Sequence, residues 1–238
     1  MTAFVAGATG YTGQQVVRWC CAQNLRTIAH VRVDSPRQAE WRDRFRSLGA
    51  EVSHTAWDLE AMTETLKDAA PTIVFALLGT TNRRRRAAAR AGGPAETYQT
   101  IDYDLTMVLL EAAQRCDSQP CFVYLSSMGV TPTSRNGYLQ VRARIEDQLR
   151  QGPLPYVIAR PAFITGADRE ERRLAERLAA WAGDGALALA GALGQREMAA
   201  RYSSLSATEL GKALVSLALD PAARDTVQEA DALRANGQ

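Results

Sequence analysis

A glycine-rich turn near the N-terminus limits what this 238-residue chain can fold into more than any other feature of its sequence. The apolar run 3–6 predicts a buried strand and residues 14–20 predict a helix, with Gly7, Gly10 and Gly13 between them. One glycine allows the tight turn, one lets a pyrophosphate approach the backbone, and one lets helix and strand pack closely. The free N–H groups of the helix start would face the anion. The spacing is G-x-x-G-x-x-G rather than the commoner G-x-G-x-x-G, so the alternative is a turn that binds nothing; we favour a dinucleotide site.

Strand and helix patterns alternate along the first two thirds of the chain. Helices of ten to fifteen residues between short apolar runs predict right-handed βαβ units and a parallel sheet that is covered on both faces. The predicted fold is therefore α/β, a single Rossmann-type doubly wound parallel sheet with helices on both faces and a small C-terminal helical region on the substrate side. After the first strand, further strands are expected at 27–33, 50–54, 72–78, 121–125 and 156–159.

We expect residues 1–238 to form a single NAD(P)-binding Rossmann domain. Within it, about 1–165 would be the cofactor-binding core, about 166–205 a substrate-side insertion, and 206–219 a C-terminal helix on the core. Ser206 can cap that last helix, and Glu209 completes a capping box. Ligands of open α/β sheets sit beyond the carboxyl ends of the strands, so the insertion would cover the substrate end of the cofactor. The alternative, that it only extends the core, stays open.

Composition restricts the class of protein further. Hydrophobic residues make up 46% of the chain, which is enough for a sizeable core, and the net charge is only +2. The arginine run 83–86 is interpreted as a solvated loop, because no aromatic residues are interleaved with it. No apolar run approaches the roughly 20 residues that span a bilayer, and no signal peptide is recognisable. The cysteines form no C-x-x-C pair, which favours reduced thiols and no metal site: Cys20, Cys21, Cys116 and Cys121.

These features predict a soluble cytoplasmic protein with a small-molecule substrate, without nucleic acid or membrane partners, as a monomer or homodimer. Three residues near the end of the second strand or shortly after it bear on the cofactor. Arg32 stands 19 residues beyond Gly13, where NADP enzymes place an arginine on the 2′-phosphate and NAD enzymes an acid on the ribose. Arg37 could add a second charge, whereas Asp34 could be the ribose acid of an NAD site. We expect NADP(H), with NAD(H) the less favoured alternative.

Further candidate binding residues follow the third and fourth strands. Asp58 and Leu59 fit the rim of an adenine pocket, and Asp58 fits a helix N-cap equally well. Leu78, Gly79 and Thr80 end the fourth strand, where a glycine allows the backbone to approach the cofactor ribose.

The residues that could carry chemistry come after the fifth strand. Ser126 and Ser127 end that strand, and Tyr138 and Arg142 lie one turn apart on the next predicted helix. A fixed cation stabilises a tyrosine phenolate, which prepares it for proton transfer with a substrate oxygen that a serine could orient. The alternative is a pair on the helix surface beside two capping serines. The sequence alone does not decide which serine would face a ligand.

Taken together, these motifs resemble the atypical short-chain dehydrogenase/reductase family, and within it the TIP30/CC3 group. The resemblance spans about residues 2–165, and it rests on the motifs at 7–13, 78–81, 125–127, 138–142 and 160–161. It implies that the cofactor pyrophosphate is held by Thr9, Gly10, Tyr11 and Thr12.

The same resemblance implies that Arg32 holds the 2′-phosphate and that Leu78 and Gly79 contact the nicotinamide ribose. It also implies that Tyr138 is the acid/base and that Pro161 lines the nicotinamide.

The chain departs from the family at Arg142, where the family has a lysine that bonds the ribose and depresses the pKa of the tyrosine. Arginine keeps the charge but does not release a proton, which puts a lysine-dependent proton relay in doubt. We therefore expect an NADP(H)-dependent oxidoreductase acting on a small carbonyl or related substrate. The alternative is a non-catalytic NADP(H)-binding redox sensor or regulatory protein.

Overall fold

The computed structural model describes residues 1–80, 96–162, 164–165 and 205–237. Its strands are β1 (Thr2–Ala6), β2 (Arg26–His30), β3 (Glu51–Ser53), β4 (Ile73–Ala76), β5 (Cys121–Leu125), β6 (Tyr156–Arg160), β7 (Ile164–Thr165), β8 (Leu205–Ser206) and β9 (Thr226–Glu229). Its α-helices are α1 (Tyr11–Ala22), α2 (Gln38–Ser47), α3 (Leu59–Ala69), α5 (Leu105–Gln114), α6 (Gly137–Gln151), α10 (Ala207–Leu219) and α11 (Ala230–Gly237). A π-helical segment, η1 (Tyr98–Asp104), precedes α5, and a short 3-10 turn, η2 (Pro221–Ala223), follows α10.

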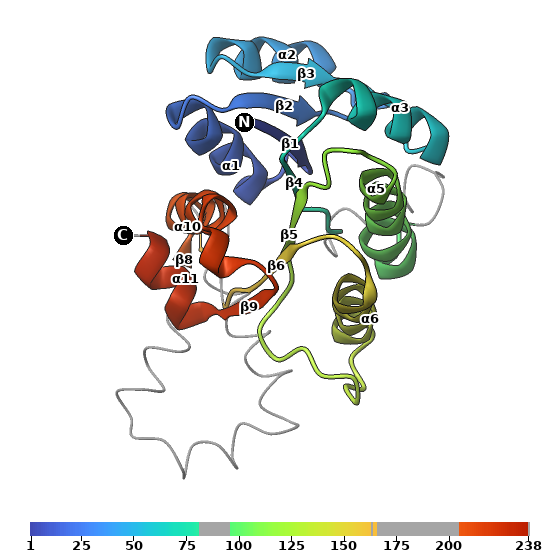
Figure 1. Ribbon diagram of the computed structural model, residues 1–238, viewed down its shortest axis with the longest axis vertical. Helices are drawn as coiled ribbons and strands as arrows, with labels where there is room; N and C mark the ends of the chain where they lie inside the picture. Colours follow the sequence, from blue (N-terminus) through green and yellow to red (C-terminus); the bar gives the residue numbers. More distant parts are fainter. Residues whose placement is uncertain (81–95, 163, 166–204, 238) are drawn as a thin grey trace.

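A seven-stranded parallel sheet in the order β3-β2-β1-β4-β5-β6-β9 forms the centre of the molecule (Figure 1). The chain begins in the middle at β1, moves outward to β3, and returns past β1 to build the other half from β4. This order confirms the predicted fold class, a Rossmann-type doubly wound sheet. It also creates a switch point between β1 and β4, whose carboxyl ends are the place where such sheets bind ligands.

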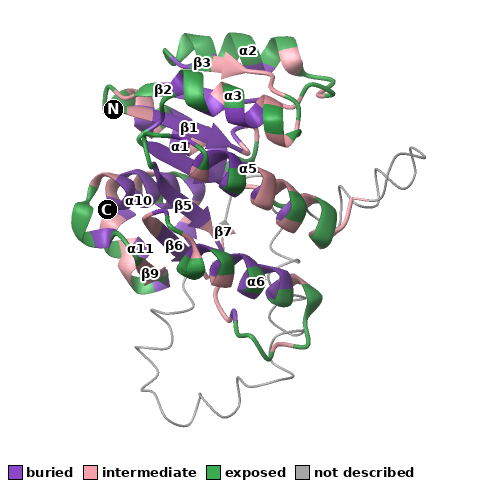
Figure 2. Cartoon of the chain, turned by 45° about the vertical axis from the view of Figure 1, so that its right-hand side comes forward, coloured by how far each residue is buried: buried purple, intermediate pink, exposed green. Residues whose placement is uncertain are grey.

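Two apolar layers, one on each face of the sheet, hold the helices in place. Side chains alternate along β1, so that Ala3 and Val5 join the core under α1 and α10, while Phe4 and Ala6 join the core under α3, α5 and α6. All four side chains are fully buried, and the inner strands of the sheet are coloured mostly as buried in Figure 2. The sheet is therefore covered on both faces, as parallel sheets require.

Side-chain caps fix where several helices begin. Asp58 Oδ1 accepts hydrogen bonds from the backbone N–H groups of Glu60 and Ala61, both at 3.1 Å, at the start of α3. At α10, Ser206 Oγ accepts from the Glu209 N–H at 3.2 Å, while Glu209 Oε2 accepts from the Ser206 N–H at 2.7 Å. This confirms the predicted capping box.

The C-terminal part of the sheet differs from the expectation of a purely helical end. Strand β9 adds a seventh strand beside β6, and α11 follows it and packs against α10. Residues Thr226–Glu229 are half-buried or exposed, so this edge strand lacks the apolar run that marks the inner strands. The sequence pattern at 98–115 predicts a single helix, but the structure divides this stretch into the π-helical segment η1 at 98–104 and the α-helix α5 at 105–114.

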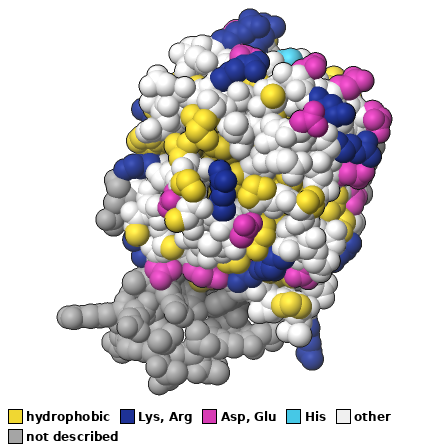
Figure 3. Space-filling model, in the orientation of Figure 1, with side chains coloured by type: hydrophobic (Ala, Val, Ile, Leu, Met, Phe, Trp, Pro, Cys, Tyr) yellow, Lys and Arg dark blue, Asp and Glu magenta, His cyan; other side chains and the backbone are white. Residues whose placement is uncertain are grey.

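Several sequence-based expectations fall outside the described residues: the arginine run 83–86, Thr81, and nearly all of the insertion at 166–205. Among the helices that the structure describes, none has the length and apolar character needed to cross a membrane. Basic and acidic side chains are interspersed over the face drawn in Figure 3, in keeping with the small net charge of +2.

We predict that Gly211→Ala destabilises the fold, because a Cβ at Gly211 would lie 2.6 Å from Gln15 Cβ where α10 crosses α1. The free energy of unfolding in urea should fall by about 1–3 kcal/mol. Gly137→Ala is the matched control, since a Cβ at Gly137 meets nothing within 4 Å, and alanine favours a helix. If both variants unfold at the wild-type midpoint, the close packing of α1 on α10 is wrong.

Candidate functional site

The glycine turn after β1 has a shape that only glycine allows at two positions. Gly7 has a φ of +83°, and a Cβ there would lie 2.5 Å from the carbonyl oxygen of Leu77. A Cβ at Gly13 would lie 2.1 Å from the carbonyl oxygen of Gly7. The first glycine thus brings β1 against the end of β4, and the third brings α1 against the turn.

Between them, Gly10 is exposed and forms the N-cap of α1, with its N–H donating to the Gly7 carbonyl at 2.9 Å. No side chain caps this helix start, so α1 presents its first N–H groups at the switch point of the sheet. Thr9 is half-buried and Tyr11 is exposed beside it, whereas Thr12 is buried in the first turn of α1.

Arg32 lies just after β2 between two carboxylates. Its Nε is 3.5 Å from Asp34 Oδ1, and its Nη1 is 3.5 Å from Glu96 Oε1. After β3, the exposed Asp58 caps α3 and the half-buried Leu59 packs against the core. Arg32 and Asp34 follow β2, and Asp58 and Leu59 follow β3, so these four residues lie at the strand ends where the sequence predicts the adenosine half of a cofactor.

At the end of β4, Leu78 is half-buried, Gly79 is exposed and Thr80 is buried. The Thr80 N–H donates to Asp102 Oδ2 at 2.9 Å, which ties this loop to η1. A Cβ at Gly79 would lie 3.2 Å from a guanidinium nitrogen of Arg142, so the loop passes close over that side chain. The ends of β4, η1 and α6 therefore meet at one place.

Arg142 is buried where the end of β4, η1 and α6 contact one another. Its Nη2 donates to Asp102 Oδ1 at 2.9 Å, and its Nη1 donates to Tyr124 Oη at 3.1 Å and to the Leu125 carbonyl. Burial alone would lower the pKa of the guanidinium, but Tyr124, Tyr138 and Asp102 raise it overall, so Arg142 stays charged. For Tyr124 burial acts in the opposite direction and raises the pKa of the phenol, so its hydroxyl stays protonated.

Tyr138 lies half-buried at the start of α6, with the Arg142 guanidinium over its ring at 5.0 Å from the centroid. The Tyr98 ring meets the same ring edge-on at 5.2 Å. The cation and the edge-on aromatic ring together orient the Tyr138 ring. The structure thus brings together Tyr138 and Arg142, as the sequence predicts for two residues one turn apart.

The two serines after β5 have different surroundings. Ser126 is buried, and its hydroxyl donates to Glu146 Oε1 at 2.6 Å. Ser127 is half-buried and its hydroxyl donates to the adjacent Met128 carbonyl at 3.3 Å. Pro161 is buried beside this loop, and its carbonyl accepts from the Met128 N–H at 3.0 Å.

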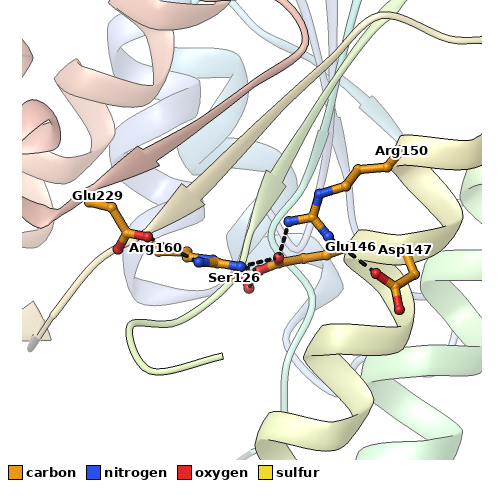
Figure 4. Close-up of polar contacts among 6 residues, drawn as sticks. All are labelled: Ser126, Glu146, Asp147, Arg150, Arg160 and Glu229. Carbon is orange, nitrogen blue, oxygen red and sulfur yellow. Dashed lines mark hydrogen bonds and ion pairs between the residues drawn. The ribbon is translucent and has the colours of Figure 1, made fainter. Parts of the chain in front are cut away.

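Glu146, which holds Ser126, is the centre of a charged network shown in Figure 4. Its fully buried carboxylate accepts from Arg160 at 3.0 and 2.6 Å and from Arg150 at 2.7 Å. Arg160 also donates to Glu229 at 3.0 Å, so the network joins α6 to the ends of β5, β6 and β9. Burial raises the pKa of Glu146, but hydrogen bonds from Arg160 and Ser126 outweigh it and lower that pKa overall.

Sequence reasoning missed three of these residues: Tyr124, Asp102 and Glu146. Tyr124 reads as one more apolar position of β5, and Asp102 lies inside a predicted helix. For Glu146 a signal exists, because Tyr138, Arg142, Glu146 and Arg150 recur every four residues and share one face of α6.

The fold and the glycine turn define a class of protein, the Rossmann-type dinucleotide-binding proteins. The family described as NAD(P)H-binding matches residues 7–185, and the chain belongs to it. The chain is 30% identical over 238 residues to the Saccharomyces cerevisiae protein FMP52. The aligned region covers 96% of this chain and 92% of that protein. A similar structure is a Bacillus halodurans protein provisionally classed as an NAD-dependent epimerase/dehydratase, with a TM-score of 0.66, 15% identity and 99% coverage of both chains.

These comparisons correct one expectation. The Saccharomyces cerevisiae protein is named as mitochondrial, and so is FMP52 of Candida albicans, which is 27% identical over 183 residues, 75% of this chain and 74% of that protein. The cytoplasmic location expected from the sequence is therefore wrong. That expectation rested on the lack of an apolar secretory signal, and such a signal does not separate the cytoplasm from the mitochondrion.

The residues present fit an NAD(P)H molecule. Gly7 and Gly13 keep the backbone open where any Cβ would collide, and the uncapped start of α1 offers N–H groups to a pyrophosphate. Thr80 Oγ1 and Arg142 Nε are among the buried polar atoms that have no hydrogen-bond partner within the described residues. Both lie beside the end of β4, where ribose hydroxyls of a cofactor would satisfy them.

We predict that Glu146→Gln lowers the free energy of unfolding at pH 7 by about 3–5 kcal/mol, because it leaves two arginines facing a neutral amide. The pKa of Glu146 is lowered from 4.5 in the folded protein, so its contribution is present above that pH and is lost as the pH falls through the folded value. The gap between wild type and variant should therefore close at low pH in chemical denaturation series.

The matched control is Asp147→Asn on the same helix, because Asp147 is half-exposed and its ion pair with Arg150, at 3.2 Å, is open to solvent. Its stability should stay close to wild type at every pH. Equal losses for the two variants would contradict a special role of the buried carboxylate.

Proposed function

We propose that the protein is an NADP(H)-dependent oxidoreductase of the atypical short-chain dehydrogenase type that acts on a small carbonyl or related substrate. The observation that carries this proposal is the contact between Tyr138 and the buried Arg142 cation, 5.0 Å from ring centroid to guanidinium. It lies at the carboxyl ends of the strands in a chain of the NAD(P)H-binding family. An ionisable hydroxyl beside a fixed positive charge is suited to proton transfer.

In this mechanism a bound nicotinamide supplies or accepts the hydride. Tyr138 gives its phenolic proton to the substrate oxygen in reduction and takes it back in oxidation. Arg142 stabilises the phenolate that is left, and its charge persists because Asp102 holds the guanidinium in place. The Ser127 hydroxyl donates a hydrogen bond to the same substrate oxygen. Ser126 is less suited to this role, because its buried hydroxyl donates to the Glu146 carboxylate at 2.6 Å, whereas the half-buried Ser127 hydroxyl makes only a longer bond of 3.3 Å to the Met128 carbonyl.

Arg32 supports NADP(H) as the cofactor, since a guanidinium after β2 matches the 2′-phosphate in charge and hydrogen-bonding geometry. The remaining binding roles are proposed as the family resemblance implies them: the turn from Thr9 to Thr12 for the pyrophosphate, Asp58 and Leu59 for the adenine, and 78–80 with Pro161 for the nicotinamide riboside.

A second candidate, a non-catalytic NADP(H) sensor, is favoured by the contacts of Arg142. Its two terminal nitrogens donate to Asp102, Tyr124 and the carbonyls of Leu78 and Leu125, so the side chain is an anchor within the protein. A guanidinium held in this way does not release a proton. The sensor would bind cofactor and a partner protein without turnover.

We predict that Tyr138→Phe lowers kcat by about 10²- to 10⁴-fold on any carbonyl that a screen with NADPH identifies. The dissociation constant for NADPH, measured by calorimetry, should stay within about twofold because the ring and its contacts remain. Unchanged turnover in the variant would refute Tyr138 as the acid/base. Cofactor binding without turnover on any substrate would favour the sensor.

We also predict that alanine variants of the two serines have different effects, one on kcat and the other on thermal stability. Ser127→Ala should lower kcat by about tenfold or more and leave thermal stability unchanged, since it removes one donor to the substrate oxygen. Ser126→Ala should lower the melting temperature, because it removes a buried hydrogen bond to a carboxylate, while the catalytic step changes little. The reverse pattern would assign the substrate contact to Ser126.

A further inference from the structure

Arg32 is held by carboxylates that a cofactor phosphate would have to replace. The guanidinium lies 3.5 Å from Asp34 on its own loop and 3.5 Å from Glu96, which comes from the segment before η1. Its side chain is 37% exposed, so it lies at the protein surface rather than inside the core. The Arg32–Glu96 pair therefore links the end of β2 to the segment that precedes η1.

The two carboxylates differ in how strongly water screens them. The Asp34 side chain is 74% exposed, whereas that of Glu96 is only 16% exposed. Exposed charges contribute little because solvent and salt weaken them, and less exposed charges act more strongly at the same distance. Glu96 is therefore the stronger competitor for the Arg32 cation.

We propose that Glu96 is a specificity-determining residue that limits the preference for NADPH over NADH by competing with the 2′-phosphate for Arg32. This proposal rests on the proposed function, because it requires the adenosine half of the cofactor to reach Arg32. The chemistry of the two cofactors differs at this one point. The 2′-phosphate carries a charge of about −1.5 to −2 near pH 7, whereas the 2′-hydroxyl of NADH is neutral.

The 2′-phosphate of NADPH can bind Arg32 only when the Arg32–Glu96 ion pair breaks. The Glu96 carboxylate then lies close to the negatively charged phosphate. For NADH, no such exchange is needed, because a neutral hydroxyl leaves the ion pair in place. Removing the Glu96 charge should consequently favour the phosphorylated cofactor and leave the other nearly unchanged.

The test is calorimetric titration of wild type and Glu96→Gln with NADPH and NADH at low salt. The dissociation constant for NADPH should fall by about three- to tenfold, and that for NADH should change by less than about twofold. Asp34→Asn should also lower the dissociation constant for NADPH, but by a smaller factor. Added salt should reduce all of these differences.

Glu51→Gln is the matched control, because Glu51 also pairs with an arginine of β2, Arg26 at 2.7 Å, but at the opposite end of that strand. It should leave both dissociation constants unchanged. Thermal melting verifies that each variant is folded, and Glu96→Ala provides a second variant without the charge.

A double-mutant cycle with Arg32→Ala decides the mechanism. In the Arg32→Ala background, Glu96→Gln should change the ratio of the NADPH and NADH dissociation constants by a smaller factor than in the wild type, since the ion pair is already absent. Additive effects, or equal shifts for NADPH and NADH, would overturn the proposal for Glu96. Failure of the wild type to bind either cofactor would instead overturn the proposed function.

Discussion

The geometry of the candidate site depends on the buried ion pair between Arg142 and Asp102. The two side chains are 6% and 0% exposed, and their charged atoms are 2.9 Å apart. Asp102 also accepts from the Thr80 N–H, so a single carboxylate joins η1, the loop after β4 and helix α6. Removing one member of such a pair leaves an uncompensated buried charge and costs about 3–5 kcal/mol. Tyr138 packs against the guanidinium that this ion pair holds, at 5.0 Å from its ring centroid.

Helix α6 repeats the same arrangement one turn further along. Glu146 is buried as completely as Asp102 and is held by Arg160 and Arg150. The face of α6 toward the sheet thus carries a cation at Arg142 and an anion at Glu146, each matched by an opposite charge from elsewhere in the chain. Paired charges can stay ionised without water, and their directional bonds set the register of α6 on the sheet.

Most of the fold was predictable from the sequence because its signals are local. The glycine turn, the alternation of apolar runs with helices and the Ser206–Glu209 cap each depend on residues close together in the chain. Strand β9 was not predictable in this way, because an edge strand with the sequence Thr-Val-Gln-Glu has neither an apolar run nor clear alternation. Its place in the sheet depends on its pairing with β6, 69 positions earlier at Val157 and Thr226.

The candidate site was predictable only where its residues share one helix or one turn. Tyr138 and Arg142 lie on one helix, and the structure brings them together. The partner of Ser126 is 20 residues away and the partner of Arg142 is 40 residues away, and no local pattern connects them. In the sequence, a buried carboxylate within a helix, such as that of Asp102 or Glu146, looks the same as a solvent-exposed one. Its role can therefore be recognised only in the folded structure.

The arginine at position 142 changes what that position can do. A lysine has three donors on one nitrogen, whereas the planar guanidinium has five in a fixed fork. Here that fork reaches Asp102, Tyr124 and the Leu125 carbonyl at once, so the cation is fixed to the sheet ends and to η1. Its charge acts on Tyr138 through the ring face. Position 142 thus keeps a positive charge beside the Tyr138 ring, but the side chain that carries it is fixed by its hydrogen bonds and has no proton that it can release.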